Sequence, residues 1–132
     1  MALQDLPVML GGFKLMITEA PSVKLKELED GSMTPVVDRV SGEEQYVVTL
    51  FAKPLPVDGR RAGKGEEIRV NLPGDPGEGF EEGMYVELVN AVVNTYEIPD
   101  RNNPRVIASA GLWFKAAGLK PAARPSVVPN AA

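Results

Sequence analysis

The amino-acid sequence predicts a small all-β protein whose five or six short strands close into a Greek-key barrel, with a β-sandwich as the second choice. The chain has 132 residues, which fits one domain. Its 13 glycines and 12 prolines make up about a fifth of the chain, which is too many for a helical bundle and typical of short strands joined by turns. Apolar and polar residues alternate between these turns. An open sheet of this size would leave a long edge, and closure removes it.

The first expected strand runs from Phe13 to Leu28 and is interrupted at 20–22. Apolar residues alternate with polar residues on both sides of this interruption. A proline in the middle of such a run, here Pro21, indicates a bulge or a sharp bend. We therefore expect one long, kinked strand that starts the barrel.

The other expected strands are separated by turns rich in glycine, proline and acidic residues. The strongest of them, QYVVTLFAK, is apolar on both faces. The segment 73–83 cannot hold a long helix, because glycine or proline recurs every second or third residue. In chain order these strands are expected at 34–40, 45–53, 68–72, 84–98 and 105–115.

The chain divides into a core and two ends. We expect residues 1–12 to be an N-terminal extension, residues 13–119 to be the barrel domain, and residues 120–132 to be a flexible tail rich in proline and alanine. No stretch approaches the roughly 18 consecutive apolar residues of a membrane span. The N-terminus also lacks the cationic start of a signal peptide. We expect a soluble cytoplasmic protein without a membrane partner.

The composition disfavours most enzyme classes. The sequence has no cysteine and no histidine, so disulfides, zinc–thiolate sites, thiol nucleophiles and Ser-His-Asp chemistry are excluded. The acidic loop GDPGEG lacks the Gly-Lys-Ser/Thr ending of a phosphate-binding loop, and no calcium-loop spacing occurs. We expect no enzymatic activity, no cofactor and no metal.

The charges are segregated along the chain. The net charge is −4, which disfavours a general polyanion binder. Residues 101–132 nevertheless carry five cations and no acid, whereas residues 74–97 carry six acids and no cation. One face of the protein is therefore expected to be locally basic.

The order of the segments resembles a known family. A bent first strand precedes an apolar second strand that ends in a basic loop; IRVNLPG, GMYVEL from Gly83 and ASAGLWFKA follow. Over residues 13–117 this layout resembles the oligonucleotide-binding (OB) fold, and within it the single-stranded-DNA-binding proteins of bacteria, phages and mobile elements. Many family members have a helix where this chain has the loop 73–83, and the tail lacks the acidic, phenylalanine-tipped end of the bacterial members.

Binding of a single strand without reading its sequence needs cations for the phosphates and exposed aromatic rings for the bases. Alternation places Phe51 and Lys53 outward on the second strand, with Thr49 marking the wet face, and places Arg69 outward on the third strand. The loop DGRRAGKG adds a dense cluster of cations among glycines. The expected nucleic-acid-binding residues are Phe51, Lys53, Arg60, Arg61, Lys64, Arg69, Tyr85 and Trp113.

Each aromatic residue also has a structural interpretation. Phe51 and Tyr85 are equally suited to pack under a loop or at a dimer contact, and a lone tryptophan such as Trp113 more often caps a barrel. Tyr46 and Tyr96 are expected to be structural.

We therefore expect a non-catalytic single-stranded-DNA-binding protein, of phage or mobile-element type, that supports replication or recombination and forms a homo-oligomer. The alternative is an all-β protein-interaction module or phage structural or assembly component that binds no nucleic acid. A carbohydrate-binding OB domain is a weaker third possibility, because aromatic residues make up only 6% of the chain.

Overall fold

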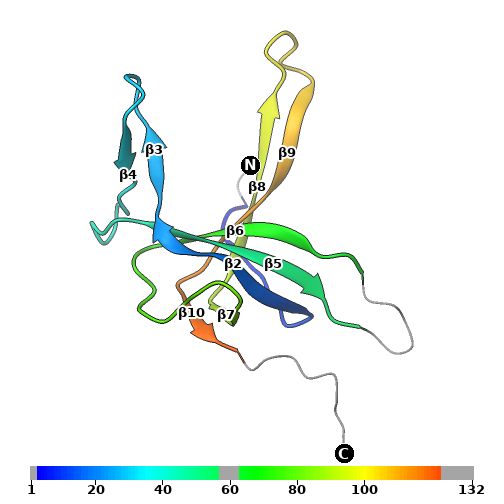
Figure 1. Ribbon diagram of the computed structural model, residues 1–132. Coiled ribbons are helices and arrows are strands. Elements are labelled where there is room, and N and C mark those ends of the chain that lie inside the picture. The colour runs from blue at the N-terminus through cyan, green and yellow to red at the C-terminus, as the bar shows by residue number, and fades with distance from the viewer. Residues whose placement is uncertain (1–2, 57–62, 123–132) are drawn as a thin grey trace, which may run out of the picture.

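The computed structural model describes residues 3–56 and 63–122, and over these ranges the chain forms ten β-strands and no helix (Figure 1). The expectation of an all-β protein is confirmed. Eight strands form one strongly curled sheet, a half-barrel, in the order β1-β8-β9-β6-β5-β2-β7-β10. The remaining two strands, β3 and β4, form a separate hairpin.

The strands have the following bounds: β1 Leu6–Pro7, β2 Phe13–Val23, β3 Leu25–Glu27, β4 Met33–Pro35, β5 Tyr46–Pro54, β6 Glu66–Leu72, β7 Tyr85–Val89, β8 Val92–Pro99, β9 Ile107–Lys115 and β10 Gly118–Pro121. The count exceeds the expected five or six because two expected strands are split and the terminal regions add β1 and β10. Residues 6–7 of the expected extension and residues 120–121 of the expected tail are thus parts of the sheet.

The first expected strand is split where the chain changes direction. The register of β2 against β5 shifts between Ile17 and Glu19 and again between Glu19 and Ser22. These irregularities confirm the bulge expected around Pro21, since extra residues on one strand bend it and increase its twist. The chain leaves the sheet at Lys24, and β3 projects away from the half-barrel.

The other expected strand that is split, 84–98, forms β7 and β8, and the turn between them curls the sheet. β7 and β8 lie near opposite ends of the strand order, yet only Asn90 and Ala91 separate them along the chain. Asn90 has a φ of 50°, in the left-handed region that asparagine tolerates better than most residues. The short turn brings the two ends of the sheet together, and the Val8 amide, which donates to the Ala91 carbonyl, fixes the N-terminal segment at the same place.

The core lies on the concave side of the curled sheet. Val48 and Leu50 of β5 are buried there, as expected from alternation. Thr49 does not mark the wet face, however, because its side chain is only 5% exposed. Its hydroxyl donates to Glu19 and its carbonyl accepts from the Thr18 hydroxyl, so β2 covers it. The core consists of Leu15, Ile17, Val48, Leu50, Ala52, Val70, Leu72, Val86, Ala116 and Leu119.

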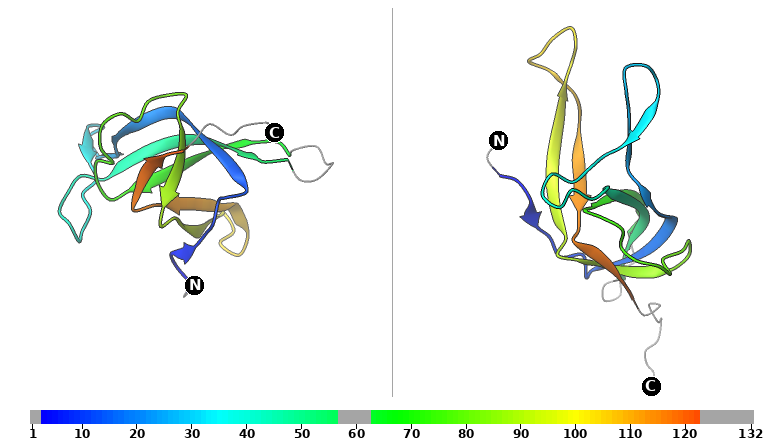
Figure 2. Two further views of the ribbon diagram at one scale, coloured as in Figure 1. Left: turned by 90° about the horizontal axis from the view of Figure 1, so that it is seen from below. Right: turned by 90° about the vertical axis from the view of Figure 1, so that its left-hand side faces the viewer.

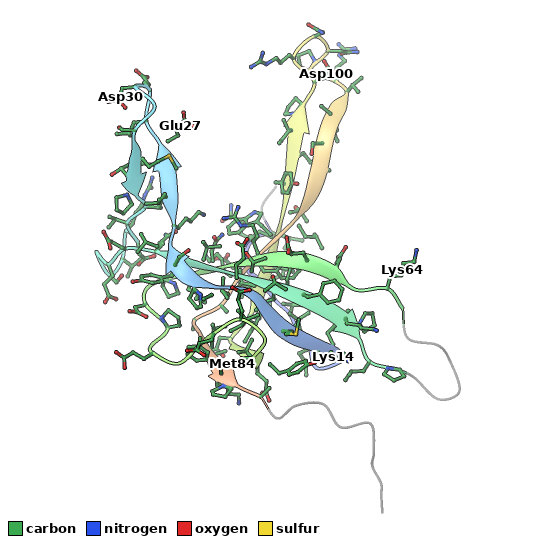
Figure 3. The ribbon with its side chains drawn as sticks, in the orientation of Figure 1. Lys14, Glu27, Asp30, Lys64, Met84 and Asp100 are labelled. Carbon is green, nitrogen blue, oxygen red and sulfur yellow. The ribbon has the colours of Figure 1, made fainter. Side chains whose placement is uncertain are left out.

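Two hairpins project from the same side of the half-barrel (Figures 1 and 2). One is the β3–β4 arm, residues 25–35, and the other is the β8–β9 arm, residues 92–115. Figure 3 shows Asp30 at the tip of the first arm and Asp100 at the tip of the second. Between them, the outer face of β6 and β9 is left open, and this opening positions the candidate site.

Candidate nucleic-acid interface

Two adjoining cavities, of about 600 and 380 Å³, lie between the foot of the β3–β4 arm and the β8–β9 arm. Both are lined by Lys24, Asn71 and Trp113, so they form one continuous depression. We call it the inter-arm groove. Its side chains with chemistry suited to a nucleic acid are Lys24, Arg69, Asn71, Tyr96, Trp113 and Lys115.

Strand register places these side chains on one face. Val70 and Leu72 of β6 are buried in the core, so the residues between and beside them, Arg69 and Asn71, face outward. β9 pairs with β6 in parallel, with Asn71 opposite Lys115. Alternation along β9 then directs Trp113 to the same outer face.

Two cations, Lys24 and Arg69, lie near each other on the floor of the groove, and neither forms an ion pair with a described residue. Lys24 sits at the break between β2 and β3, where its amide donates to the Gln45 carbonyl and its carbonyl accepts from the Val36 amide. Burial lowers the pKa of the Lys24 ammonium, and the nearby charge of Arg69 lowers it further. Within residues 3–56 and 63–122, neither cation forms an ion pair. Neither cation therefore has a carboxylate within ion-pair distance among the described residues.

The aromatic residues lie on the wall formed by the β8–β9 arm. Trp113 is 36% exposed, so it is not the buried cap of a barrel. The Lys115 ammonium lies 5.9 Å from the centroid of its ring, within the range of a cation–π contact. Tyr96, expected to be structural, is 40% exposed and lines the groove. Tyr46 does pack against the core.

The groove also contains acids. Asp38 lies on one wall, and its carboxylate accepts hydrogen bonds from the Ser41 and Val40 amides, which lower its pKa. Glu66 and Glu67 line the other end. Glu67 accepts a hydrogen bond of 3.5 Å from the Thr18 hydroxyl. The groove is thus mixed in charge, and two of its cations, Lys24 and Arg69, form no ion pair with a described residue.

The structure separates the expected site residues into groups. Arg69 and Trp113 lie in the inter-arm groove. Phe51 and Tyr85 are each paired with Met16 in the register, so they share the outer face of the sheet with Arg69, but neither lines the groove.

The ring of Phe51 is covered by backbone, because a Cβ on Gly65 would lie 2.4 Å from it. This packing agrees with the structural interpretation of Phe51. Tyr85 lines a different cavity, together with Phe13.

Two further cations expected to bind nucleic acid, Lys53 and Lys64, do not line the groove. Lys53 is paired with Lys14 in the register, and Lys64 is exposed before the start of β6 (Figure 3). Arg60 and Arg61 lie outside the described residues.

The sequence already pairs Lys115 with Trp113 as the phosphate partner of a stacking ring, because the two residues lie two positions apart on one strand. Two other groove residues, Tyr96 and Lys24, were missed. Tyr96 belongs to the same long β-prone run as Tyr85, and its exposure depends on the arm extending beyond the half-barrel. Nothing in the local sequence marks Lys24, because its position depends on where the first strand breaks.

Comparison with known proteins finds no matching family model, no matching curated protein and no matching solved structure. Among the described residues, no cluster of acidic side chains has the arrangement of a metal site. The described part of the chain also contains no helix of the length and apolar character needed to cross a membrane.

Proposed function

We propose that the inter-arm groove binds single-stranded DNA and that the protein is a non-catalytic strand binder that supports replication or recombination. The observation that carries this proposal is the proximity of Lys24 and Arg69, whose charges disfavour each other and have no ion-pair partner among the described residues. A phosphate seated between them would convert this repulsion into attraction. It would also release the counterions of the strand, which is the main source of non-specific affinity.

The aromatic wall supports a single strand over a duplex. Bases stack on exposed aromatic rings only when they are unpaired, and each such contact contributes about 1–3 kcal/mol. Trp113 and Tyr96 offer such rings beside the cationic floor. Phosphates along the floor and bases on the β8–β9 arm would together occupy the groove.

The connectivity supports an OB-type Greek-key barrel. If β7 and β8 are treated as one strand kinked at Asn90, the paired strands form a ring of five: β2, β5, β6, β9 and β8/β7. Every pair in this ring is antiparallel except β6–β9. We propose that the curled eight-stranded sheet is built on a barrel of this type. The OB fold binds oligonucleotides on the outer face of its second and third strands, which correspond here to β5 and β6.

A protein-interaction or phage assembly role is the second candidate, and the exposed apolar side chains of the arms favour it. Met33 on the first arm and Ile98 and Ile107 on the second are each more than half exposed. Large apolar side chains that remain exposed on projecting arms are candidates for contact with another protein. The same side chains would also serve the contacts of a homo-oligomer.

Titration with a poly-thymidine oligonucleotide distinguishes the two candidates. We would follow Trp113 fluorescence and, in parallel, the anisotropy of a labelled strand at low and high salt. Strand binding predicts affinity that falls with salt, with a log–log slope of about −0.7 for each phosphate contacted. Quenching would place Trp113 near the bases. Absence of binding at low salt would overturn the strand-binding proposal and favour the protein-interaction role.

A further inference from the structure

A carboxylate of the chain is already bound to Lys115, a residue that lines the inter-arm groove. The Oδ1 atom of Asp5 accepts a hydrogen bond of 2.9 Å from the side-chain amide of Asn94 and lies 3.3 Å from the Lys115 ammonium. The Asp5 backbone amide in turn donates to Asn94 Oδ1 at 2.8 Å. These contacts lower the pKa of the Asp5 carboxyl, chiefly through Asn94 and then through Lys115. A single anionic oxygen is thus held by one neutral and one charged donor.

The two donors are fixed by the fold. Asn94 is only 8% exposed, and it is paired with Trp113 in the β8–β9 register. Lys115 lies on the adjoining wall of the groove, near the Trp113 ring. Asp5, by contrast, is exposed at the end of the N-terminal segment, so its carboxylate can leave without opening a cavity.

Asp5 has an unusual backbone conformation. Its φ of 50° lies in the left-handed region, which disfavours residues with a side chain, although aspartate tolerates it better than most. The next residues, Leu6 and Pro7, pair with β8 and hold the segment against Asn94. The N-terminal segment therefore places this carboxylate on Lys115 at some conformational cost.

We propose that Asn94 and Lys115 form a binding site for a backbone phosphate of the strand, and that the Asp5 carboxylate is its internal occupant and competitor. This inference rests on the proposed function. A phosphate oxygen needs the same donors as the carboxylate oxygen, and Trp113 beside Lys115 would receive the adjoining base. Asp38, the other acid near Lys115, has its carboxylate engaged by the Ser41 and Val40 amides. Asp5 is then the group that competes with the strand for Lys115.

The test compares Asp5→Asn with Glu87→Gln. Both variants remove one negative charge and one ion pair, but Glu87 pairs with Lys120 on β10, outside the groove. Asparagine tolerates a positive φ, so Asp5→Asn is expected to keep the backbone conformation. We expect Asp5→Asn to bind a poly-thymidine strand about two- to fivefold more tightly at low salt, since an exposed ion pair competes only weakly. Its salt slope should steepen by about 0.7, for one further phosphate contact.

The variant Lys115→Gln completes the design. In its background Asp5→Asn should have no effect on affinity, because the site has lost its charged donor. Urea unfolding of each variant verifies that it folds.

Equal affinities of Asp5→Asn and Glu87→Gln, in a wild-type protein that binds the strand, would overturn the inference and leave the proposed function standing. Absence of binding by every variant would overturn both.

Discussion

Tyr96 of β8 lies across Gly111 of β9, so closely that a Cβ on Gly111 would be 2.7 Å from the Tyr96 hydroxyl oxygen. The two residues are direct partners in the antiparallel register. Asn94 is paired with Trp113 two residues nearer the half-barrel. The missing side chain at Gly111 allows the ring to lie on the arm. The exposed β8–β9 arm therefore presents two aromatic residues, Tyr96 and Trp113, to the same groove.

Gly111→Ala should displace the Tyr96 ring and weaken strand binding to the level of Tyr96→Ala. Loss of one stacked base corresponds to about 1–3 kcal/mol of binding free energy, and the anisotropy titration measures it. Combining the two substitutions should add little, because both remove the same contact. Gly12→Ala is the matched control, since no atom lies within 4 Å of its added Cβ. If Gly111→Ala binds the strand with unchanged affinity, the Tyr96 ring does not contact the strand.

Lys24→Gln and Arg69→Gln should each weaken binding of a poly-thymidine strand and reduce the magnitude of its salt slope by about 0.7. The reason is that each cation neutralises a phosphate on the floor of the groove. Lys26→Gln removes an equal charge from the β3–β4 arm, from a lysine that does not line the groove. A loss with Lys26→Gln as large as that with Lys24→Gln would assign the effect to net charge and not to the groove.

The lowered pKa of Lys24 predicts a pH dependence of stability. Above the folded-state pKa and below the ordinary value of 10.5, the unfolded chain binds more protons than the folded chain at this residue. Stability therefore rises with pH across this window, because deprotonation of Lys24 in the folded chain removes the free-energy cost of burying its charged ammonium. The measurement is the urea midpoint of wild type minus that of Lys24→Gln, from neutral pH to pH 10.5. A difference that stays constant with pH would contradict the prediction.

The stability of the protein should depend on whether the residue at position 90 tolerates a positive φ. Asn90→Val places a β-branched residue at a φ of 50° and should destabilise the protein by about 1–2 kcal/mol. Asn90→Gly should retain stability, because glycine adopts this conformation freely. Urea unfolding of the two variants gives the comparison. Equal stabilities would mean that the kink between β7 and β8 does not depend on this conformation.

The sequence predicts the strands well, because each is encoded by local alternation between apolar and polar residues. The inward positions of Val48 and Leu50 follow from that alternation. Thr49 was expected on the wet face, but the bulged part of β2 covers it. Alternation predicts the face of the sheet on which a residue lies. It does not predict whether a neighbouring strand covers that residue.

Local signals in the sequence are enough to predict an all-β protein, the regions that hold eight of its ten strands, and the bend in the first strand. Turn residues and periodicity are local, and they act whatever the rest of the chain does. Which outward-facing residues meet depends instead on how the strands are arranged in the folded protein. Lys24 reaches Arg69 because the first strand breaks at that point, and Asp5 reaches Asn94, 89 residues away, because the N-terminal segment pairs with β8. Such encounters depend on strand register and on the curl of the sheet, which the packing of the whole core fixes at once.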